Sequence, residues 1–502
     1  MGAFRRRDFL KISSLLPLSL AVPKFMQNLQ AGRKNIIVIV FDAFSAYNIP
    51  LYGYSRATTP NLARLAEKAI VYHNHFAGSN FTSSGTATLL TGTLPWTHRA
   101  FGANSTVAER VVSRNIFNAL DGYHRMAFTH NGWAYTLLRQ FEGYIDDLIP
   151  RTDLYIKSPD GFIQALFEND DDIANVSWSR NINLEGQGYA YSLFLSRVFG
   201  KLQELRLKNL RSEFPLGLPT QGLTDGFLLE EAVDAIHDRL VKALKPVFGY
   251  FHFLPPHVPY RTHIEFYDHF KNDGFKPVEK ATSIFAEDPE NEDLVGDRKN
   301  YDEFLLYVDR EFGRLFNQLE QSGMLENTYL ILTSDHGEMF ERGISGHGRP
   351  VLYQPVVRVP LMIFEPGRSE RLDVYSPTNA IDIFPTILNM ARQPIPPEWA
   401  EGALLPPYNT KVDVSRSIYS VYSYYSNQDQ VLGETSVAMI KGKYKLIYYF
   451  GYKKTEGDHV ELFDIETDPQ ELQNLSSVQS GITEELQTEL KAKIVEVNKP
   501  YM

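Results

Sequence analysis

Short apolar runs and helical stripes alternate along most of the chain. The runs show little alternation between apolar and polar positions, which is typical of strands buried on both faces of a parallel sheet. They are IIVIVF at 36–41, RMAFTH at 125–130, PVFGYFHFL at 246–254 and TYLILTSD at 328–335. Strands of this kind, separated by helical patterns, predict an α/β fold with a doubly wound, mostly parallel sheet.

Helices are predicted where apolar residues recur every three or four positions. The clearest pattern covers residues 301–323 and ends at Gly323. Its stripe consists of Phe304, Val308, Phe312, Leu315 and Leu319. Thr59 and Pro60 open a second helix over residues 61–70, because proline is tolerated at the first helical position. The charged and polar stretch from about 270 to 300 is predicted to be a surface loop.

The hydrophobic pattern divides the chain near the proline-rich residues 394–397. Beyond them, SVAMIKGKYKLIYYF and VELFDI are typical of antiparallel strands, and ITEELQTELKAKIVEV is typical of a final helix. Residues 396–502 are therefore predicted to form a smaller C-terminal α+β subdomain, and residues 33–395 the main domain. Within the main domain, about 151–245 carries few strand signals and is predicted to be an insertion.

The first 30 residues have a different character. Three arginines at 5–7 precede Asp-Phe-Leu-Lys and an apolar run of roughly a dozen residues, which resembles a bacterial twin-arginine export signal. The run is short for a membrane span. We expect residues 1–30 to be an export signal, or a membrane anchor if they stay attached, and the body of the protein to be periplasmic or otherwise extracytoplasmic. An amphipathic first helix is the alternative.

Composition narrows the range of partners. The 502 residues are 43% hydrophobic and 22% charged, with a net charge of −11, which argues against a nucleic acid bound through its phosphates. The absence of cysteine excludes disulfides, thiolate zinc sites and a cysteine nucleophile. A small anionic substrate stays compatible with the negative charge, because a bound metal ion reverses the local field.

Candidate ligands follow several of the predicted strands. In open α/β sheets, ligands bind beyond the carboxyl ends of the strands. Asp42 and His257 follow two of the four runs, and the pairs His130-Asn131 and Asp335-His336 stand at the ends of the other two. Of these, Asp42, Asp335 and His336 form an oxygen and nitrogen set suited to a divalent metal. His252 lies inside an apolar run, where a histidine is more often a core residue.

The segment FTSSGTATLLTG at 81–92 is either a polar loop or a short helix that begins at Thr82 and ends at Gly92. As a helix, it would offer the free N–H groups of Ser83 and Ser84 to a tetrahedral anion. A metal-bound hydroxyl loses its proton more easily and becomes a nucleophile. Thr82 is therefore predicted to be a metal ligand and the nucleophile together, and we expect Ser83, His130 and Asn131 to bind substrate.

The chain resembles the sulfatase branch of the alkaline phosphatase superfamily over residues 34–475. The resemblance rests on NIIVIVFDA, LYGYSRATTPNLARLA, LLTG, LPPHVPY, NTYLILTSDHGE, GHG with LYQPVVRVPLMIF, DIFPTIL, KYKLIYY and LFDIETDPQELQNL. It implies an alkaline-phosphatase-like fold and a metal-dependent esterase for sulfate or phosphate. It also implies that Asp42, Asp335 and His336 hold the metal, that Thr82 is the nucleophile, and that His257 and His347 contact the ester or its leaving group.

One departure from the family changes the expected chemistry. Where sulfatases have Cys/Ser-x-Pro-Ser-Arg, this chain has Thr-Ser-Ser-Gly-Thr at 82–86, and the paired Asp-Asp is reduced to Asp42-Ala43. Oxidation of threonine does not give the formylglycine aldehyde, so no formylglycine is expected. A threonine nucleophile resembles the phosphoethanolamine and lipoteichoic-acid transferases and the phosphodiesterases of the superfamily, which hold one metal with a carboxylate, Thr, Asp and His.

The sequence therefore predicts hydrolysis of a phosphate or sulfate ester, with the phosphoester slightly favoured. We expect one divalent ion, for which Zn, Mn and Ca are the candidates. A glycan and a lipid headgroup both suit the alcohol part, and peripheral or N-terminal membrane association is compatible with the chain. Two alternatives stay open: a phosphoalkyl or phosphoethanolamine transferase on a cell-envelope acceptor, and a non-catalytic protein that binds an anion or glycan.

Overall fold

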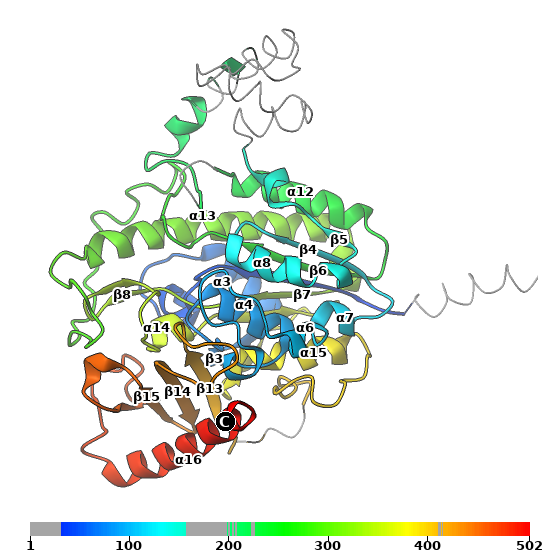
Figure 1. The fold of residues 1–502 in the computed structure, drawn as a ribbon. Coiled ribbons are helices and arrows are strands. Elements are labelled where there is room, and N and C mark those ends of the chain that lie inside the picture. The colour runs from blue at the N-terminus through cyan, green and yellow to red at the C-terminus, as the bar shows by residue number, and fades with distance from the viewer. Residues whose placement is uncertain are drawn as a thin grey trace, which may run out of the picture.

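The computed structural model describes residues 32–156, 208–221, 226–409, 413 and 415–502, together with residues 198, 201, 202 and 205. The main domain is built on an eight-stranded sheet in the order β11-β2-β10-β7-β1-β6-β4-β5 (Figure 1). The strands are β1 (Asn35–Phe41), β2 (Ile70–Tyr72), β4 (His124–Thr129), β5 (Asp147–Leu148), β6 (Val247–Phe253), β7 (Thr328–Thr333), β10 (Leu361–Phe364) and β11 (Leu372–Val374).

The centre of this sheet is parallel. β1 pairs with β6 on one side and with β7 on the other, parallel to both, and β4 continues the parallel series beyond β6. β10 runs antiparallel to β7 and to β2. All residues of β1 are buried, as expected for a strand covered on both faces. The predicted mostly parallel α/β sheet is confirmed, and the carboxyl ends of β1, β4, β6 and β7 share one edge.

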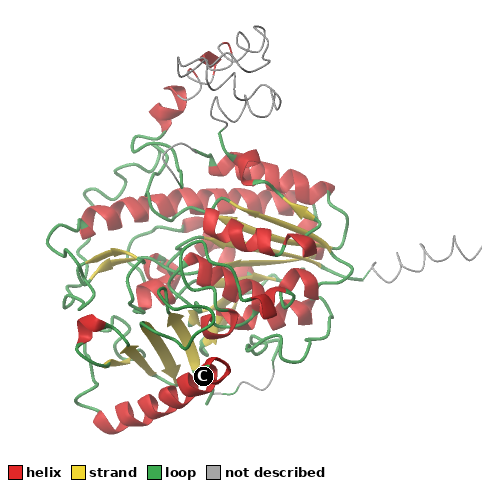
Figure 2. Cartoon of the chain, in the orientation of Figure 1, coloured by secondary structure: helices red, strands yellow, loops and turns green. Residues whose placement is uncertain are grey.

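Helices cover both faces of the sheet (Figure 2). One layer contains α3 (Pro60–Leu65), α12 (Leu229–Lys242) and α13 (Leu294–Gln321). The other contains α4 (Thr82–Thr91), α7 (Ile116–Ala119), α8 (Gly132–Gln140) and α15 (Ile383–Met390). Short helices and strands complete the main domain: α5 (Pro95–His98), α6 (Glu109–Val112), α14 (Gln354–Val357), the parallel pair β3 (His75–Phe76) and β12 (Thr378–Asn379), and the antiparallel pair β8 (Met339–Glu341) and β9 (Ile344–Gly346).

Two helix predictions need correction. α13 begins at Leu294, inside the stretch predicted to be a surface loop, because the Asp293 carboxylate caps it by accepting a hydrogen bond from the Gly296 N–H at 2.9 Å. The helix predicted over 61–70 is shorter than expected. It ends at Leu65, continues as a single 3-10 turn over Ala66–Lys68, and leads directly into strand β2.

The C-terminal subdomain is a four-stranded antiparallel sheet covered by one long helix, as predicted. Its strands are β13 (Ile418–Tyr422), β14 (Thr435–Lys441), β15 (Tyr444–Phe450) and β16 (His459–Asp464), in that order, and its helix is α16 (Ser480–Asn498). Figure 1 shows this subdomain below the main domain, with α16 on its outer side.

A buried ion pair lies where the two domains meet. Lys445 Nζ donates to Glu471 Oε1 at 2.6 Å, and both side chains are fully buried. The second carboxylate oxygen of Glu471 accepts the backbone N–H of Gln354 in the main domain at 2.8 Å. Glu471 therefore has a partner on each oxygen, one from each domain.

Two sequence predictions fall largely outside the described residues. The predicted signal or anchor at 1–30 lies outside them entirely, and so does the middle of the predicted insertion at about 151–245. The described part of that insertion includes the 3-10 turn Arg151–Leu154 and α12, which packs against α13. Within the described part of the chain, none of the helices combines the length and apolar character needed to span a bilayer.

Candidate active site

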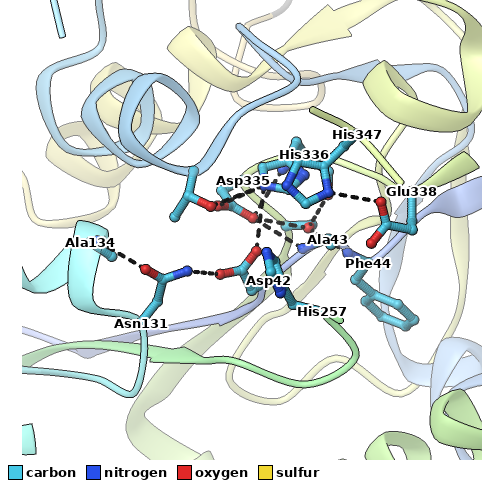
Figure 3. A network of polar contacts seen from close by, with 12 residues as sticks. Asp42, Ala43, Phe44, Asn131, Ala134, His257, Asp335, His336, Glu338 and His347 are labelled. Atoms are coloured by element: carbon cyan, nitrogen blue, oxygen red, sulfur yellow. Dashed lines mark hydrogen bonds and ion pairs between the residues drawn. The ribbon is translucent and has the colours of Figure 1, made fainter. Parts of the chain in front are cut away.

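Three buried polar side chains meet at the carboxyl edge of the main sheet. Asp42 follows β1, and Asp335 and His336 follow β7. One ligand-type atom from each lies within 4.8 Å of the other two. His336 Nε2 is 3.4 Å from Asp42 Oδ1 and 3.6 Å from Asp335 Oδ2, and Figure 3 shows the three side chains facing one another. The parallel order of β7 and β1 therefore assembles the cluster that the sequence predicted.

The backbone fixes the tautomer of His336. Its Nδ1 lies 2.9 Å from the carbonyl oxygen of Gly337, which can only accept, so Nδ1 carries the hydrogen and donates it. Burial lowers the pKa of His336, which favours the neutral ring. Nε2 then presents its lone pair to the two carboxylates, which is the form in which histidine binds a metal.

The two carboxylates carry opposite pKa shifts. Burial, and then the charge of Asp42, raise the pKa of Asp335 to about 6. Burial alone would raise the pKa of Asp42 as well, but the neighbouring His257, His252 and His336 hold it well below its usual range. Two buried carboxylates at this distance are costly when both are ionised. A divalent cation between them would remove that cost.

The pattern of missing hydrogen bonds fits such a cation. Asp42 Oδ1 and Asp335 Oδ2 are buried, and neither accepts a hydrogen bond from any residue that the structure describes. Buried carboxylate oxygens normally have partners, so these two atoms are free to bind an ion. Together with His336 Nε2 they offer the oxygen and nitrogen donors that zinc and manganese accept.

His252 corrects one interpretation of the sequence. The histidine lies inside β6, but its Nε2 is 3.5 Å from Asp42 Oδ2 and 3.8 Å from Asp335 Oδ2. This Nε2 forms no hydrogen bond within the described ranges, whereas Nδ1 lies 3.4 Å from the hydroxyl of Tyr250. It is therefore part of the carboxylate cluster rather than a satisfied core residue. The available signal was its position, one residue before the carboxyl end of a central strand.

Thr82 lies at the start of α4 and next to the cluster. Its Oγ1 is 3.2 Å from His336 Nε2. Phe81 occupies the N-cap and has no side-chain oxygen, so the first N–H groups of the helix, including that of Ser83, keep no side-chain cap. The Ser83 hydroxyl is buried and has no hydrogen-bond partner in the described part of the chain. The helix ends at Gly92 as predicted, with a φ of 65°.

Gly85 allows α4 to approach Asp335. A Cβ at this position would lie 2.3 Å from the carbonyl oxygen of Asp335, closer than real Cβ atoms come to any backbone atom. Only glycine therefore permits the close packing that brings the first turn of α4 to the cluster. The position of Thr82 relative to Asp335 depends on this contact.

Asn131 holds Asp42, whereas His130 lies in an aromatic environment. Asn131 Oδ1 accepts the N–H of Trp133 at 2.8 Å, which caps α8, and its Nδ2 donates to Asp42 Oδ2. The predicted substrate contact is thus a hydrogen-bond partner of a predicted metal ligand. The ring of His130 stacks on Phe227 with centroids 4.0 Å apart, and burial lowers its pKa well below the usual value.

His347 and His257 lie on the open side of the cluster. The ring of His347 is 4.1 Å from that of His336 and 5.0 Å from that of His257. His347 Nδ1 lies 2.7 Å from Glu338 Oε1, and the positive charge of His347 lowers the pKa of Glu338 although burial would raise it. The sequence did not single out Glu338 for this role; its place directly after the Asp-His-Gly run was the available signal.

Asn80 ties the segment after His347 to the start of α4. Its Nδ2 lies 3.2 Å from the carbonyl oxygen of His347 and 2.8 Å from those of Arg349 and Val351. Asn80 stands two residues before Thr82, so the start of α4 and the segment after His347 are fixed to each other.

Two family models match the chain. Residues 34–393 match the model described as Sulfatase, and residues 347–500 match the model described as N-sulphoglucosamine sulphohydrolase, C-terminal. The choline-sulfatase of Rhizobium meliloti (strain 1021) is 24% identical over 480 residues, which cover 90% of this chain and 84% of the relative. The arylsulfatase of Clostridium perfringens (strain 13 / Type A) is 23% identical over 482 residues, 88% of this chain and 90% of the relative.

Solved structures share the same fold. The phosphonate monoester hydrolase of Agrobacterium radiobacter superposes with a TM-score of 0.66 at 19% identity, over 93% of this chain and 96% of that chain. A structure in complex with its substrate D-glucosamine-2-N,6-O-disulfate superposes with a TM-score of 0.62 at 17% identity, over 93% of this chain and 98% of that chain. At these identities the likeness establishes the fold.

Proposed function

This chain belongs to the sulfatase family of ester-hydrolysing enzymes, and from that premise we propose that it hydrolyses a phosphate or sulfate ester by direct attack of an unmodified Thr82, with the phosphoester slightly favoured. The observation that carries the proposal is the 3.2 Å separation of Thr82 Oγ1 from His336 Nε2, beside one oxygen each of Asp42 and Asp335 that accepts no hydrogen bond from the described residues.

Asp42, Asp335 and His336 are the residues that would hold one divalent cation, and Thr82 is close enough to join them. Bound there, the cation would lower the pKa of the threonine hydroxyl and offset negative charge on the ester oxygens. The donor set suits Zn or Mn, and Ca is the ion that the sulfatase likeness adds.

The chain's own residues supply the remaining steps. The uncapped N–H groups at the start of α4 bind a non-bridging oxygen of the ester. Thr82 Oγ1 loses its proton to solvent and, as the alkoxide, forms a bond to phosphorus or sulfur while the bond to the leaving oxygen breaks on the opposite side. His257 or His347 donates a proton to the departing alcohol. Water then attacks the phosphorus or sulfur of the Thr82 ester and restores the hydroxyl.

Glu338 supports the proposed acid. Its carboxylate, 2.7 Å from His347 Nδ1, accepts the Nδ1 hydrogen and fixes the orientation of the ring. His257 is held by a 2.6 Å hydrogen bond from its Nδ1 to the carbonyl oxygen of Val258. Both rings are therefore oriented before substrate arrives.

The variant Thr82→Ala tests the nucleophile. Turnover of 4-nitrophenyl phosphate, bis(4-nitrophenyl) phosphate and 4-nitrophenyl sulfate should fall by about 10⁴-fold or more, with an unchanged circular dichroism spectrum. Thr82→Ser, which keeps the hydroxyl, should retain measurable turnover. Mass spectrometry of the wild-type protein should find Thr82 unmodified at rest and esterified after rapid quenching with the preferred substrate. Full activity in the alanine variant would contradict the proposal that Thr82 is the nucleophile.

The same panel separates hydrolase from transferase. A hydrolase releases inorganic phosphate or sulfate from the monoesters, and 4-nitrophenyl phosphate from the diester, at a rate that added alcohols leave unchanged. A transferase instead moves the group to the added alcohol and releases little of it to water. Equal total turnover with transfer to glycerol as the main product would replace hydrolysis by the transferase alternative.

Export is proposed from residues 1–30. The pair Arg6-Arg7 before Asp-Phe-Leu-Lys supports a twin-arginine signal. The double variant Arg6→Lys with Arg7→Lys should leave the protein in the cytoplasm after cell fractionation, whereas Arg33→Lys, outside the signal, should not. Export of the double variant to the same extent as the wild type would contradict a twin-arginine signal.

A further inference from the structure

A cavity of about 310 Å³ lies outside the candidate active site. We call it the cation pocket, because Lys276, Arg298 and Arg358 line it. Its aromatic and apolar walls include Tyr47, Tyr52, Tyr54, Phe275, Pro277 and Pro469. None of the residues proposed above to bind the metal, attack the ester or donate a proton lines this cavity. The cation pocket is therefore separate from the chemistry assigned to Thr82.

Arg298, near the start of α13, is a buried cation with an incomplete set of acceptors. Only 5% of its surface is exposed. Its Nη2 donates to the carbonyl oxygen of Phe340 at 2.6 Å, whereas its Nε is buried and finds no acceptor among the described residues. A buried charge is costly unless it is paired and its donors are satisfied. An anion in the cavity would supply both the missing acceptor and the missing charge.

Arg358, directly after α14, is a second cation of the same cavity. Its Nε and Nη2 donate to the carbonyl oxygen of His73 at 3.0 and 2.8 Å. A carbonyl oxygen accepts these bonds without neutralising the charge, and burial lowers the pKa of Arg358. The bonds to His73 do not use Nη1, which is therefore left for another acceptor. Two guanidinium groups of this cavity thus lack a carboxylate of their own in these contacts.

The carboxylate in the cavity wall, Glu341, is already paired. Its Oε1 accepts from Lys280 Nζ at 2.8 Å, and the two side chains are 5% and 1% exposed. Lys280 also donates to the hydroxyl of Tyr47 at 3.0 Å, which holds the lysine in place. Because Lys280 neutralises Glu341, this carboxylate does not offset the charges of Arg298 and Arg358. The cation pocket therefore has an excess of positive charge.

We propose that the cation pocket binds a small organic carboxylate with a flat, apolar body. The two oxygens of a carboxylate match the fork of a guanidinium, so the anion accepts from Arg298 while Arg358 and Lys276 add positive charge. The aromatic walls offer apolar area to the body of the ligand. The volume lies at the lower end of the range of about 300–1,000 Å³ that is typical of ligand pockets, which suits a body of one ring.

Titration calorimetry tests the cation pocket without turnover. The probes are benzoate, which has a ring and a carboxylate, benzyl alcohol, which has the ring alone, and acetate, which has the carboxylate alone. The wild-type protein should bind benzoate about tenfold more tightly than either of the others. No binding of benzoate, or binding no tighter than that of acetate or benzyl alcohol, would overturn the proposal.

Two variants place the carboxylate at these walls. Arg298→Met should weaken binding of benzoate about 30-fold, with circular dichroism to confirm that the variant folds. Lys276→Glu reverses a charge at an exposed position, where folding is not at risk, and should weaken binding about tenfold. Lys271→Glu is the matched control, since this nearby lysine is exposed and does not line the cavity. If both pocket variants bind benzoate like this control, the cation pocket is not the site.

A carboxylate is also a metal ligand, so the test must separate the cation pocket from the cluster around Asp42. Asp335→Asn removes a proposed metal ligand and should bind benzoate as the wild type does, because Asp335 does not line the cation pocket. Lost binding in Asp335→Asn together with wild-type binding in Arg298→Met would place benzoate at the candidate active site and overturn the proposal. The opposite pattern would support it, whatever the turnover of esters shows about Thr82.

Discussion

At the carboxyl edge of the main sheet, Asp42 and Asp335 lie buried with one oxygen each that accepts no hydrogen bond from the described residues, whereas at the domain junction the equally buried Glu471 has a partner on both oxygens. Both places take charge out of water, which is costly unless the charge is paired. At the junction the protein supplies the pairing itself, through Lys445. At the sheet edge, one oxygen of each carboxylate accepts no hydrogen bond from the described residues, which is the arrangement from which we propose a bound cation.

The two places distinguish buried carboxylates that stabilise the fold from buried carboxylates that belong to a candidate site. A carboxylate with a complete set of protein partners is explained by the fold. The fold does not explain Asp335, because burial and a second carboxylate raise its pKa to about 6. Groups with pKa values shifted in this way cluster at functional sites. We therefore propose that the Asp42 cluster serves chemistry and that the Lys445–Glu471 pair attaches the C-terminal subdomain, so substitutions at the two places should have opposite effects.

The largest expected effect is on turnover. Asp335→Asn removes a proposed metal ligand, so kcat/KM should fall by about 10³-fold or more. The metal-free variant should unfold at the same temperature as metal-free wild type or higher, because the repulsion between two buried carboxylates is gone. Asp373→Asn, a partly exposed carboxylate in β11, is the control for both measurements. A large loss of thermal stability in Asp335→Asn without loss of turnover would show that Asp335 stabilises the fold and does not serve the reaction.

The next effect is on stability. Lys445→Met leaves Glu471 buried without its cation and should cost about 3–5 kcal/mol in the free energy of unfolding, measured by urea denaturation. Activity of the molecules that stay folded should be nearly that of wild type. Lys443→Met is the matched control, because its ion pair with Asp464 has a lysine side chain that is 42% exposed. If both methionine variants show the same small decrease in the free energy of unfolding, burial does not distinguish the two ion pairs.

Metal removal should destabilise the sheet edge specifically. At a free metal concentration of 100 times Kd, a cation that binds only the folded state adds about 2.7 kcal/mol to the free energy of unfolding. Dialysis against a chelator should remove this contribution in wild type, and re-addition of zinc or manganese should restore it. Asp335→Asn should show almost no response to either treatment, whereas Lys445→Met should respond like wild type. Equal responses in all three proteins would place the ion elsewhere.

The smallest expected effect concerns a third buried carboxylate, which accepts hydrogen bonds from two backbone N–H groups. Asp309 accepts the N–H groups of Asn61 and Leu62 at 2.7 Å, and burial raises its pKa to about 6. Because the folded pKa lies above the unfolded value of 3.8, the stabilisation is fully present below pH 3.8 and is lost as pH rises through 6.

Between pH 4 and pH 6.5 this group should therefore lower the free energy of unfolding by about 2 kcal/mol. Asp309→Asn should lack that part of the pH dependence, as followed by urea denaturation across this range. An identical pH profile for the variant and the wild type would show that the carboxylate titrates normally.

The sequence predicted the parts of the site that depend on strand ends. Asp42, Asp335 and His336 could be found because uninterrupted apolar runs mark buried parallel strands and their carboxyl ends share an edge. The helix from Thr82 to Gly92 could be found from its terminal glycine. These features are local in sequence, and the structure shows each of them where it was expected.

The remaining features depend on side-chain direction across long sequence distances. A histidine within an apolar run gives no sign that its ring turns to two carboxylates, so His252 was interpreted as core. His130 and Asn131 are adjacent in sequence, yet one packs among aromatic rings and the other bonds to Asp42. The pairing of Glu338 with His347 depends on the turn between β8 and β9, which no residue pattern specifies.

Gly85 is a position that cannot be changed when this protein is redesigned. Because its hydrogen faces the Asp335 carbonyl where a methyl group would not fit, the helix that presents the hydroxyl cannot be shifted, and mutagenesis libraries should leave this codon fixed. New reactivity can be sought by exchanging Thr82 for serine on the unchanged backbone.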